Sequence, residues 1–303
     1  MRVWLLSLCA VGCLVACGGR RAGGGGPPSD GGVGHGDAGP RPDGAVVPPA
    51  DGGTPSDCAA EARWVYLLDD GNVLMRFQPD DLSLTPIGTL DCGSPVTPFS
   101  MAVTRDAVAW VLFQDGRLYH VSTTDARCTP TAFTPNQMGF ELFGMGFVSD
   151  TAGSSAETLH ISGGASASVG MGGSTLGTID GTSLAVRTIG GLPGWPELTG
   201  TGSGELWGFF PDTTPRSVRQ IDKTSGATPV TFPLDALGTD TARSWAFAFW
   251  GGRYYVFLKR MSDASTKIWR LDPSDGSLEE VVSDTGYSIV GAGVSTCAPV
   301  ELI

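Results

Sequence analysis

The chain has 303 residues, of which 41% are hydrophobic, enough to bury one large domain or two small ones. Glycine accounts for 45 residues and charged residues for only 17%, a composition that favours many strands joined by tight turns over long solvated helices. The net charge of −12 would repel a phosphate backbone, so we expect no nucleic-acid partner.

The N-terminus has the pattern of an export signal. A positive Met1-Arg2 precedes an apolar run from Val3 to Ala16, which has the length of a signal-peptide core and is too short to span a bilayer comfortably. The run ends in Leu14-Val15-Ala16-Cys17. This ending resembles the lipobox of bacterial lipoproteins, in which the cysteine thiol is acylated and the peptide is cut just before it. Cys13 fits the motif less well, because Ala10 stands where the motif prefers leucine.

The resemblance implies that residues 1–16 are a signal peptide and that lipid on Cys17 holds an exported protein to a membrane without a transmembrane helix. A cleaved signal peptide with an incidental cysteine is the alternative. Gly18 follows Cys17, where an aspartate would, by analogy with enteric bacteria, indicate retention at the inner membrane. We therefore expect the outer membrane or the cell surface.

Residues 17–57 are predicted to form a tether. After Cys17 this segment is mostly Gly, Pro, Asp and Ala, so it cannot offset its ordering entropy by burial and should stay disordered. At about 5–6 Å times the square root of its length, its typical span is about 35 Å. The folded domain is then expected over residues 58–303.

Four cysteines remain in that domain, namely Cys58, Cys92, Cys128 and Cys297. An even number in an exported protein predicts two disulfides, with three pairings open at this point. The domain has no Cys-x-x-Cys pair, so a thiolate zinc site is not expected. We expect neither a metal nor a cofactor.

A unit of strand, polar turn and strand recurs along the domain, as in Ile268-Trp269-Arg270-Leu271-Asp272-Pro273-Ser274-Asp275-Gly276-Ser277-Leu278. A period of roughly 40 to 50 residues is typical of β-propeller blades. Candidate first strands of the blades begin at Phe99, Phe140, Trp195, Ser244 and Ser288. They are rich in Gly and Ala, which suits the crowded axis of a propeller. The predicted fold is therefore all-β, with blades of four antiparallel strands.

The two ends of the domain complement each other. Residues 64–68, 73–77 and 84–90 supply second, third and fourth strands, and residues 288–295 supply a first strand with nothing after it. Joining them makes a fifth blade that contains both termini and leaves no open edge. This closure predicts a disulfide between Cys58 and Cys297. Cys92 and Cys128, each expected just after a fourth strand of adjacent blades, would form the other bond.

Few residues suggest catalysis. His120 and His160 occupy repeat positions that other blades fill with polar or aromatic residues, so we expect both to be structural. Asp69-Asp70-Gly71-Asn72 is expected to be a turn rather than a calcium site. Residues 163–173 form a loop of small residues, either an insertion or a flap over a ligand.

Glu141 and Glu197 fall near the same place on the first strands of adjacent blades and could both face the central channel. Such a pair resembles the architecture of five-bladed glycosidases, in which one acid protonates the leaving oxygen and another carboxylate activates water or attacks. No sequence motif of those families accompanies the pair, so we favour a protein that is not an enzyme.

Over residues 58–303 the aromatic-x-Leu-Asp-Pro-x-x-Gly turn at Trp269–Gly276 loosely resembles turns in lipid-anchored propeller proteins of bacterial envelopes. The resemblance implies no activity. The sequence predicts a monomeric envelope lipoprotein whose propeller is a binding or scaffolding module for a protein or glycan. The alternatives are a carbohydrate-active hydrolase that uses Glu141 and Glu197, and a structural surface protein without a small ligand.

Overall fold

The computed structural model describes residues 57–301, so the predictions for the signal peptide, for Cys17 and for nearly all of the tether lie outside the described residues. The described chain forms twenty strands and three short 3-10 helices, η1 (Ala60–Arg63), η2 (Ser166–Ser168) and η3 (Asp235–Leu237). None of the helices in this part of the chain is long and apolar enough to cross a membrane.

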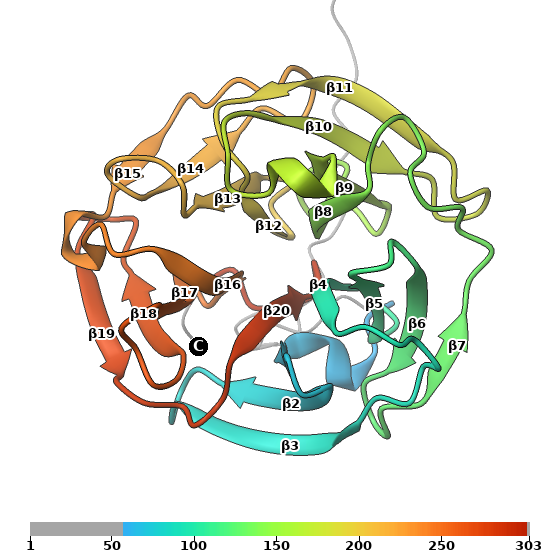
Figure 1. Ribbon diagram of the computed structural model, residues 1–303, viewed down its shortest axis with the longest axis horizontal. Helices are drawn as coiled ribbons and strands as arrows, with labels where there is room; N and C mark the ends of the chain where they lie inside the picture. The colour runs from blue at the N-terminus through green and yellow to red at the C-terminus, as the bar shows by residue number, and fades with distance from the viewer. Residues whose placement is uncertain (1–56, 302–303) are drawn as a thin grey trace, which may run out of the picture. The chain divides into compact units, whose positions relative to one another are not determined.

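The strands form five sheets of four, each antiparallel (Figure 1). With the innermost strand first, the sheets are β4 (Pro98–Val103), β5 (Val108–Phe113), β6 (Leu118–Ser122), β7 (Cys128–Pro130); β8 (Leu142–Ser149), β9 (Glu157–Gly164), β10 (Ser174–Ile179), β11 (Val186–Leu192); β12 (Glu197–Gly200), β13 (Leu206–Phe210), β14 (Ser217–Ile221), β15 (Thr231–Pro233); β16 (Ala242–Trp250), β17 (Arg253–Arg260), β18 (Lys267–Leu271), β19 (Leu278–Val282); and β20 (Ile289–Val294), β1 (Val65–Asp69), β2 (Val73–Gln78), β3 (Ser83–Thr89).

The sheets close into a ring. The innermost strands contact one another in the order β4, β8, β12, β16 and β20, and β20 returns to contact β4. The last blade joins the two ends of the chain, because β20 pairs with β1 in a register that sets Leu67 opposite Ala292. The predicted five-bladed propeller with a shared terminal blade is confirmed.

One pair of positions repeats in every blade. An aromatic ring or histidine on the second strand lies opposite a polar residue on the third, in the pairs Tyr66–Arg76, Trp110–His120, His160–Thr178, Trp207–Gln220 and Tyr255–Arg270. These are the positions at which the repeats align in the sequence. The pairing explains why both histidines have structural neighbours: His120, for example, packs its ring on Trp110 with centroids 4.5 Å apart.

The hydrophobic core is divided among the interfaces between blades. Each large cluster of buried side chains draws on two adjacent sheets, as where Phe77 of β2 packs edge-on against Tyr255 and Phe257 of β17, with ring centroids 5.5 and 5.6 Å apart. Small residues let the innermost strands approach closely. A Cβ added to Gly144 of β8 would lie 2.7 Å from the carbonyl oxygen of Pro196, the residue before β12. The expected crowding at the axis is therefore present.

The turns between third and fourth strands share one construction in three blades, those that contain β10, β14 and β18. An aspartate that follows the third strand accepts a hydrogen bond from the backbone N–H two residues later, as in Asp222 with Thr224 (2.8 Å) and Asp272 with Ser274 (2.9 Å). The turn then ends in a residue with positive φ, which is Gly226 (φ 81°) or Gly276 (φ 73°) in these two blades. Glycine adopts this conformation without the strain that a Cβ brings.

Replacing Gly276 with alanine should therefore lower the free energy of unfolding by about 1–2 kcal/mol, because a Cβ is disfavoured at this φ. Space is not the cause, since the nearest atom to the new Cβ, on Phe232, is 3.7 Å away. Gly181, in the equivalent turn after β10, lacks positive φ and has open space around its Cα. Gly181→Ala is the matched control and should be neutral or slightly stabilising in denaturant titrations. Equal losses for the two variants would contradict this account of the turn.

Candidate functional site

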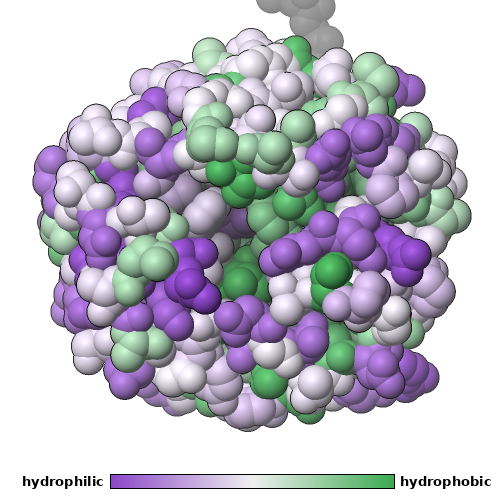
Figure 2. All heavy atoms as spheres, viewed as in Figure 1, coloured by the Kyte–Doolittle hydropathy of each residue, from purple (hydrophilic) through white to green (hydrophobic). Residues whose placement is uncertain are grey.

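The up-and-down path of the strands gives the ring two different faces. The connection face carries the blade-to-blade segments 90–97, 131–141, 193–196, 234–241 and 283–288, together with the turns between second and third strands. The closure face carries the remaining turns and both ends of the described chain. Figure 2 shows the ring hollowed at its centre, with apolar side chains in the walls and polar side chains around them.

Two disulfides are present, and both match the predicted pairing. Cys58 bonds to Cys297, with Cα atoms 6.0 Å apart, and Cys92 bonds to Cys128, with Cα atoms 5.1 Å apart. The first bond fixes the two chain ends at the closure face, where it packs with Ala62 and Ala107. One detail of the prediction is wrong: Cys128 begins the fourth strand β7 instead of following it, because that strand is only three residues long and starts late.

A buried arginine reinforces the closure. Arg105, in the turn between β4 and β5, donates from Nη2 to Asp57 (2.7 Å) and from Nη1 to the Thr296 hydroxyl (3.1 Å). Its backbone N–H donates to Glu157, which also accepts from Thr296 (3.0 and 2.8 Å). Burial raises the pKa of Glu157 despite these donors. Two chain ends and two blades are thus tied together at the closure face.

Glu197 lies at the start of β12 and is only 2% exposed. Its Oε1 accepts from the Ser100 hydroxyl of β4 (2.5 Å) and from the Met145 backbone N–H of β8 (3.3 Å). Burial raises the pKa of Glu197 to about 8, because these two hydrogen bonds do not compensate for the lost hydration. The carboxyl therefore keeps its proton at neutral pH and links the innermost strands of three blades.

Glu141 lies elsewhere. It directly precedes β8, and its Oε2 accepts from the backbone N–H and the hydroxyl of Ser166 (2.8 and 2.7 Å). The Ser166 hydroxyl and N–H lower the pKa of Glu141. It fixes the loop of small residues, which begins later than expected because β9 continues to Gly164. Within residues 57–301 no hydrogen bond joins Glu141 to Glu197, so the two carboxylates are not brought together as a pair.

The remaining sequence candidates have structural partners. His160 is buried, its Nδ1 lies 3.3 Å from the Thr158 carbonyl oxygen, and burial lowers its pKa to about 4. Asp69 forms the expected turn, where its Oδ1 accepts from the N–H groups of Gly71 and Val73 (3.0 and 2.7 Å). Among the described residues, no group of three or more His, Cys, Asp or Glu side chains is arranged to hold a metal ion.

The connection face contains a cavity of about 330 Å³, lined by Val169, Gly170, the segment 211–216, Gly238, Thr239, Thr241, Ala242 and Trp245. We call it the connection-face cavity. Its walls come from the small-residue loop of one blade, from the β13–β14 turn of the next and from the start of β16. It lies in the range of about 300–1,000 Å³ that small-molecule sites occupy, at the lower end.

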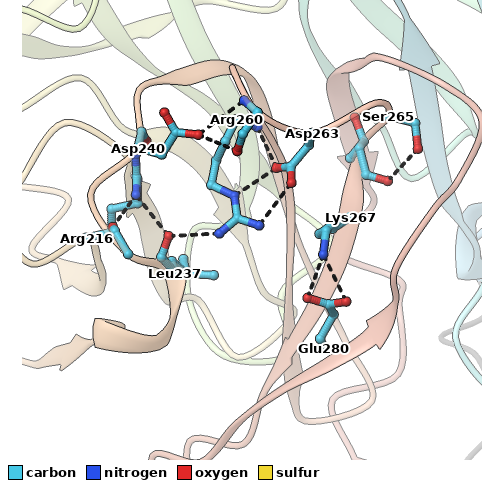
Figure 3. Close-up of polar contacts among 11 residues, drawn as sticks. Arg216, Leu237, Asp240, Arg260, Asp263, Ser265, Lys267 and Glu280 are labelled. Atoms are coloured by element: carbon cyan, nitrogen blue, oxygen red, sulfur yellow. Dashed lines mark hydrogen bonds and ion pairs between the residues drawn. The ribbon is translucent and has the colours of Figure 1, made fainter.

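Arg216 holds two walls of this cavity together (Figure 3). It is 5% exposed, and its guanidinium donates to the carbonyl oxygens of Pro211 (3.1 Å), Leu237 (3.1 Å), Gly238 and Asp240. Burial lowers the pKa of this guanidinium. Arg260 extends the clamp, since it donates to Asp263 (2.8 and 3.0 Å) and to the Leu237 carbonyl oxygen (3.4 Å). The segment 237–240 is thereby fixed from both sides.

Asp212 contributes a carboxylate to the lining of the cavity, and Trp245 contributes an aromatic ring. Both Asp212 oxygens lie within hydrogen-bond reach of the Trp195 backbone N–H (3.3 and 3.2 Å), and burial raises the pKa of this carboxyl. Trp245 is partly exposed and packs against the core cluster that contains Trp207 and Phe247. The cavity thus combines one carboxylate, one aromatic ring, several threonines and a guanidinium engaged by carbonyl groups.

Asp212, Arg216 and Trp245 were not identified as site residues from the sequence. The run Pro211-Asp212-Thr213-Thr214-Pro215-Arg216 after a strand indicates an ordered turn, and Trp245 is an aromatic residue near the start of a predicted first strand. Either signal could have marked the segment as unusual. Neither shows that the two meet, because the loops that assemble the cavity lie far apart in the sequence.

No family model and no curated protein matches the chain. Among solved structures, the chain is similar to hydrazine synthase of Kuenenia stuttgartiensis, with 12% identity, a TM-score of 0.41 and coverage of 74% of this chain and 64% of that one. TolB from Acinetobacter baumannii gives 13% identity, a TM-score of 0.44 and coverage of 73% and 52%. Dihydro-heme d1 dehydrogenase NirN in complex with DHE gives 14% identity, a TM-score of 0.36 and coverage of 75% and 46%. The chain spans about half to two thirds of the length of each.

Proposed function

We propose that this protein is an exported, lipid-anchored binding module that engages its ligand or partner through the connection face. The observation that carries the proposal is the difference between the two faces. The closure face carries the Cys58–Cys297 bond and the Arg105 cluster. Its cavity of about 360 Å³ is lined by charged side chains that pair with one another, namely Arg253 with Asp272 and Arg270 with Glu279. The connection face carries the clamped cavity, where several lining hydroxyl groups form no hydrogen bond within residues 57–301 and are available to a ligand. Two disulfides favour an oxidising compartment.

The path of the chain supports an orientation for the module. Asp57, the first described residue, pairs with Arg105 at the closure face. A tether that ends there would attach the module by its closure face and leave the connection face clear of the attachment. A lipid on Cys17 and a tether of about 35 Å would then present the cavity to the surrounding envelope or medium.

Cys17→Ala should release the protein from membranes and leave an uncleaved precursor, because processing and acylation both require that thiol in the proposed lipobox. The measurement is fractionation of cells that express the full chain, with mass spectrometry of the N-terminal peptide. Cys13→Ala is the matched control and should leave both processing and attachment unchanged. A Cys17→Ala protein that remains processed and membrane-bound would contradict the anchor.

Photo-cross-linking tests which face binds. The connection face exposes Met171 (66%) and Met261 (59%), and the closure face exposes Val230 (37%) and Val300 (42%). A benzophenone amino acid placed at each position in turn should give adducts in the intact envelope from the two methionine sites. Adducts from the valine sites alone would contradict the proposed binding face. Their absence at all four sites would favour a structural role.

A further inference from the structure

We propose that the connection-face cavity is a binding site for a neutral saccharide, whose ring packs on Trp245 and whose hydroxyl groups bond to Asp212 and the lining threonines. This inference rests on the proposed function, in that it names the ligand class of the face assigned there to binding.

The charges of the lining disfavour an ionic ligand. One carboxylate, Asp212, and one guanidinium, Arg216, line the cavity, and no Lys or His accompanies them. Arg216 already donates to four carbonyl oxygens, so little of its donor capacity is left for an anion. A cation would meet a single aromatic ring and a nearby guanidinium, instead of the several rings that bind such ligands tightly. The lining is formally neutral and favours a neutral ligand.

The lining is nevertheless polar. Thr214, Thr239 and Thr241 are exposed at its edge, and none of their hydroxyl groups forms a hydrogen bond within residues 57–301. Each hydroxyl can both donate and accept, and a carboxylate offers further acceptor positions beside those used by the Trp195 N–H. A ligand with several hydroxyl groups satisfies such a set better than an apolar one.

Trp245 supplies the apolar surface that such a ligand would need. One side of the residue packs on the core and the residue also lines the cavity, so its position is fixed before a ligand arrives. Aromatic rings contribute large contact areas at low entropic cost. The axial C–H groups of a sugar ring present a matching apolar face. Gly170 and Gly238, both without any atom within 4 Å of an added Cβ, leave room for close approach at the rim.

The walls of the cavity are held rigidly, as expected of a preformed binding site. The Arg216 clamp and the Arg260–Asp263 pair fix the segment 237–240, and the Ser262 backbone N–H donates to Asp240 (3.1 Å). Asp212 is held by the Trp195 N–H from the neighbouring blade-to-blade segment. A preformed cavity loses little conformational entropy on binding, which favours affinity for a small ligand.

The experiment is ligand-observed NMR and calorimetry on the full chain in detergent. The probes are methyl glucosides, maltotetraose, cellotetraose and tetra-N-acetylchitotetraose, with choline and acetate as charged probes. We expect at least one neutral saccharide to bind and Trp245→Ala to weaken it about tenfold or more. Trp245→Phe should retain part of the affinity. Trp64→Ala, which removes a partly buried tryptophan outside the cavity, is the matched control and should leave the affinity unchanged.

Each other outcome overturns the assignment. A saccharide whose affinity survives Trp245→Ala, in a variant whose thermal unfolding matches the parent, binds elsewhere. Preference for choline or acetate would refute the neutral ligand class, as would the absence of binding by every saccharide probe. None of these results affects the cross-linking test of the connection face, so the failure of this inference can be told apart from the failure of the proposed function.

Discussion

Replacing both Cys58 and Cys297 with alanine should lower the free energy of unfolding by about 5 kcal/mol. This is the larger of the two losses expected when one disulfide is removed. The bond closes a loop with a sequence separation of 239 residues. By the chain-entropy argument, a cross-link over such a loop removes more freedom from the unfolded chain than a short one does. The bond also reinforces the pairing of β20 with β1 in the shared blade, where the two ends of the described chain meet.

The matched control is the double variant Cys92→Ala and Cys128→Ala. Its bond spans 36 residues, for which the same argument gives about 4 kcal/mol. Denaturant titrations of both variants against the parent give the comparison directly. If the control loses more stability than the Cys58 and Cys297 variant, ring closure is not the principal role of the longer bond.

Glu197→Gln should make the protein more stable above neutral pH and remove most of its loss of stability between about pH 6.5 and 8. The unfolded chain releases this proton near pH 4.5, the ordinary value for a glutamate, whereas the folded chain holds it until about pH 8. Between these values the folded state binds more protons, so stability falls as the pH rises, by up to about 1.4 kcal/mol per pH unit. Over the stated interval the parent should lose about 2 kcal/mol.

Between about pH 6.5 and 8 no buried histidine of residues 57–301 offsets the effect of Glu197 on stability. His160 is buried with a pKa of about 4, and a histidine with a lowered pKa makes stability rise with pH only up to its unfolded value near 6.5. Glutamine can still accept from Ser100 and Met145, so the packing of the three strands is kept. Glu141→Gln is the control, because its pKa is lowered and its side chain lies at the surface. An unchanged slope in Glu197→Gln would contradict the assignment of a protonated carboxyl at the axis.

The architecture was accessible from the sequence because its signals are local and repeat. The turn at Leu271–Gly276 and the paired positions such as Tyr255 and Arg270 recur with a period that only a blade explains. Ring closure followed from counting strands at the two ends, and the position of Cys58 and Cys297 then left one sensible pairing. In each case the two residues of a pair belong to the same blade, so the repeat pattern itself predicts their contact.

The site was less accessible because its contacts cross blades. Glu197 is set by Ser100, 97 residues away, and a sequence pattern cannot show that a side chain reaches past one blade to the next. Glu141 differs for a more local reason. The strand β8 begins at Leu142, two residues later than the predicted start at Phe140, so Glu141 precedes the strand and its carboxylate binds Ser166 in the loop that follows β9. Arg216 is one polar residue in a polar turn, and only the fold brings the four carbonyl groups around it.

Disulfide mapping by mass spectrometry under non-reducing conditions tests the closed ring, from which the assignment of the two faces follows. Arginine residues lie between each successive pair of the four cysteines, so trypsin places Cys58, Cys92, Cys128 and Cys297 on separate peptides. The account predicts one linked pair that contains Cys58 and Cys297 and a second that contains Cys92 and Cys128. A peptide in which Cys58 is joined to Cys92 or Cys128 would contradict the closure, and with it the assignment of the opposite face to binding.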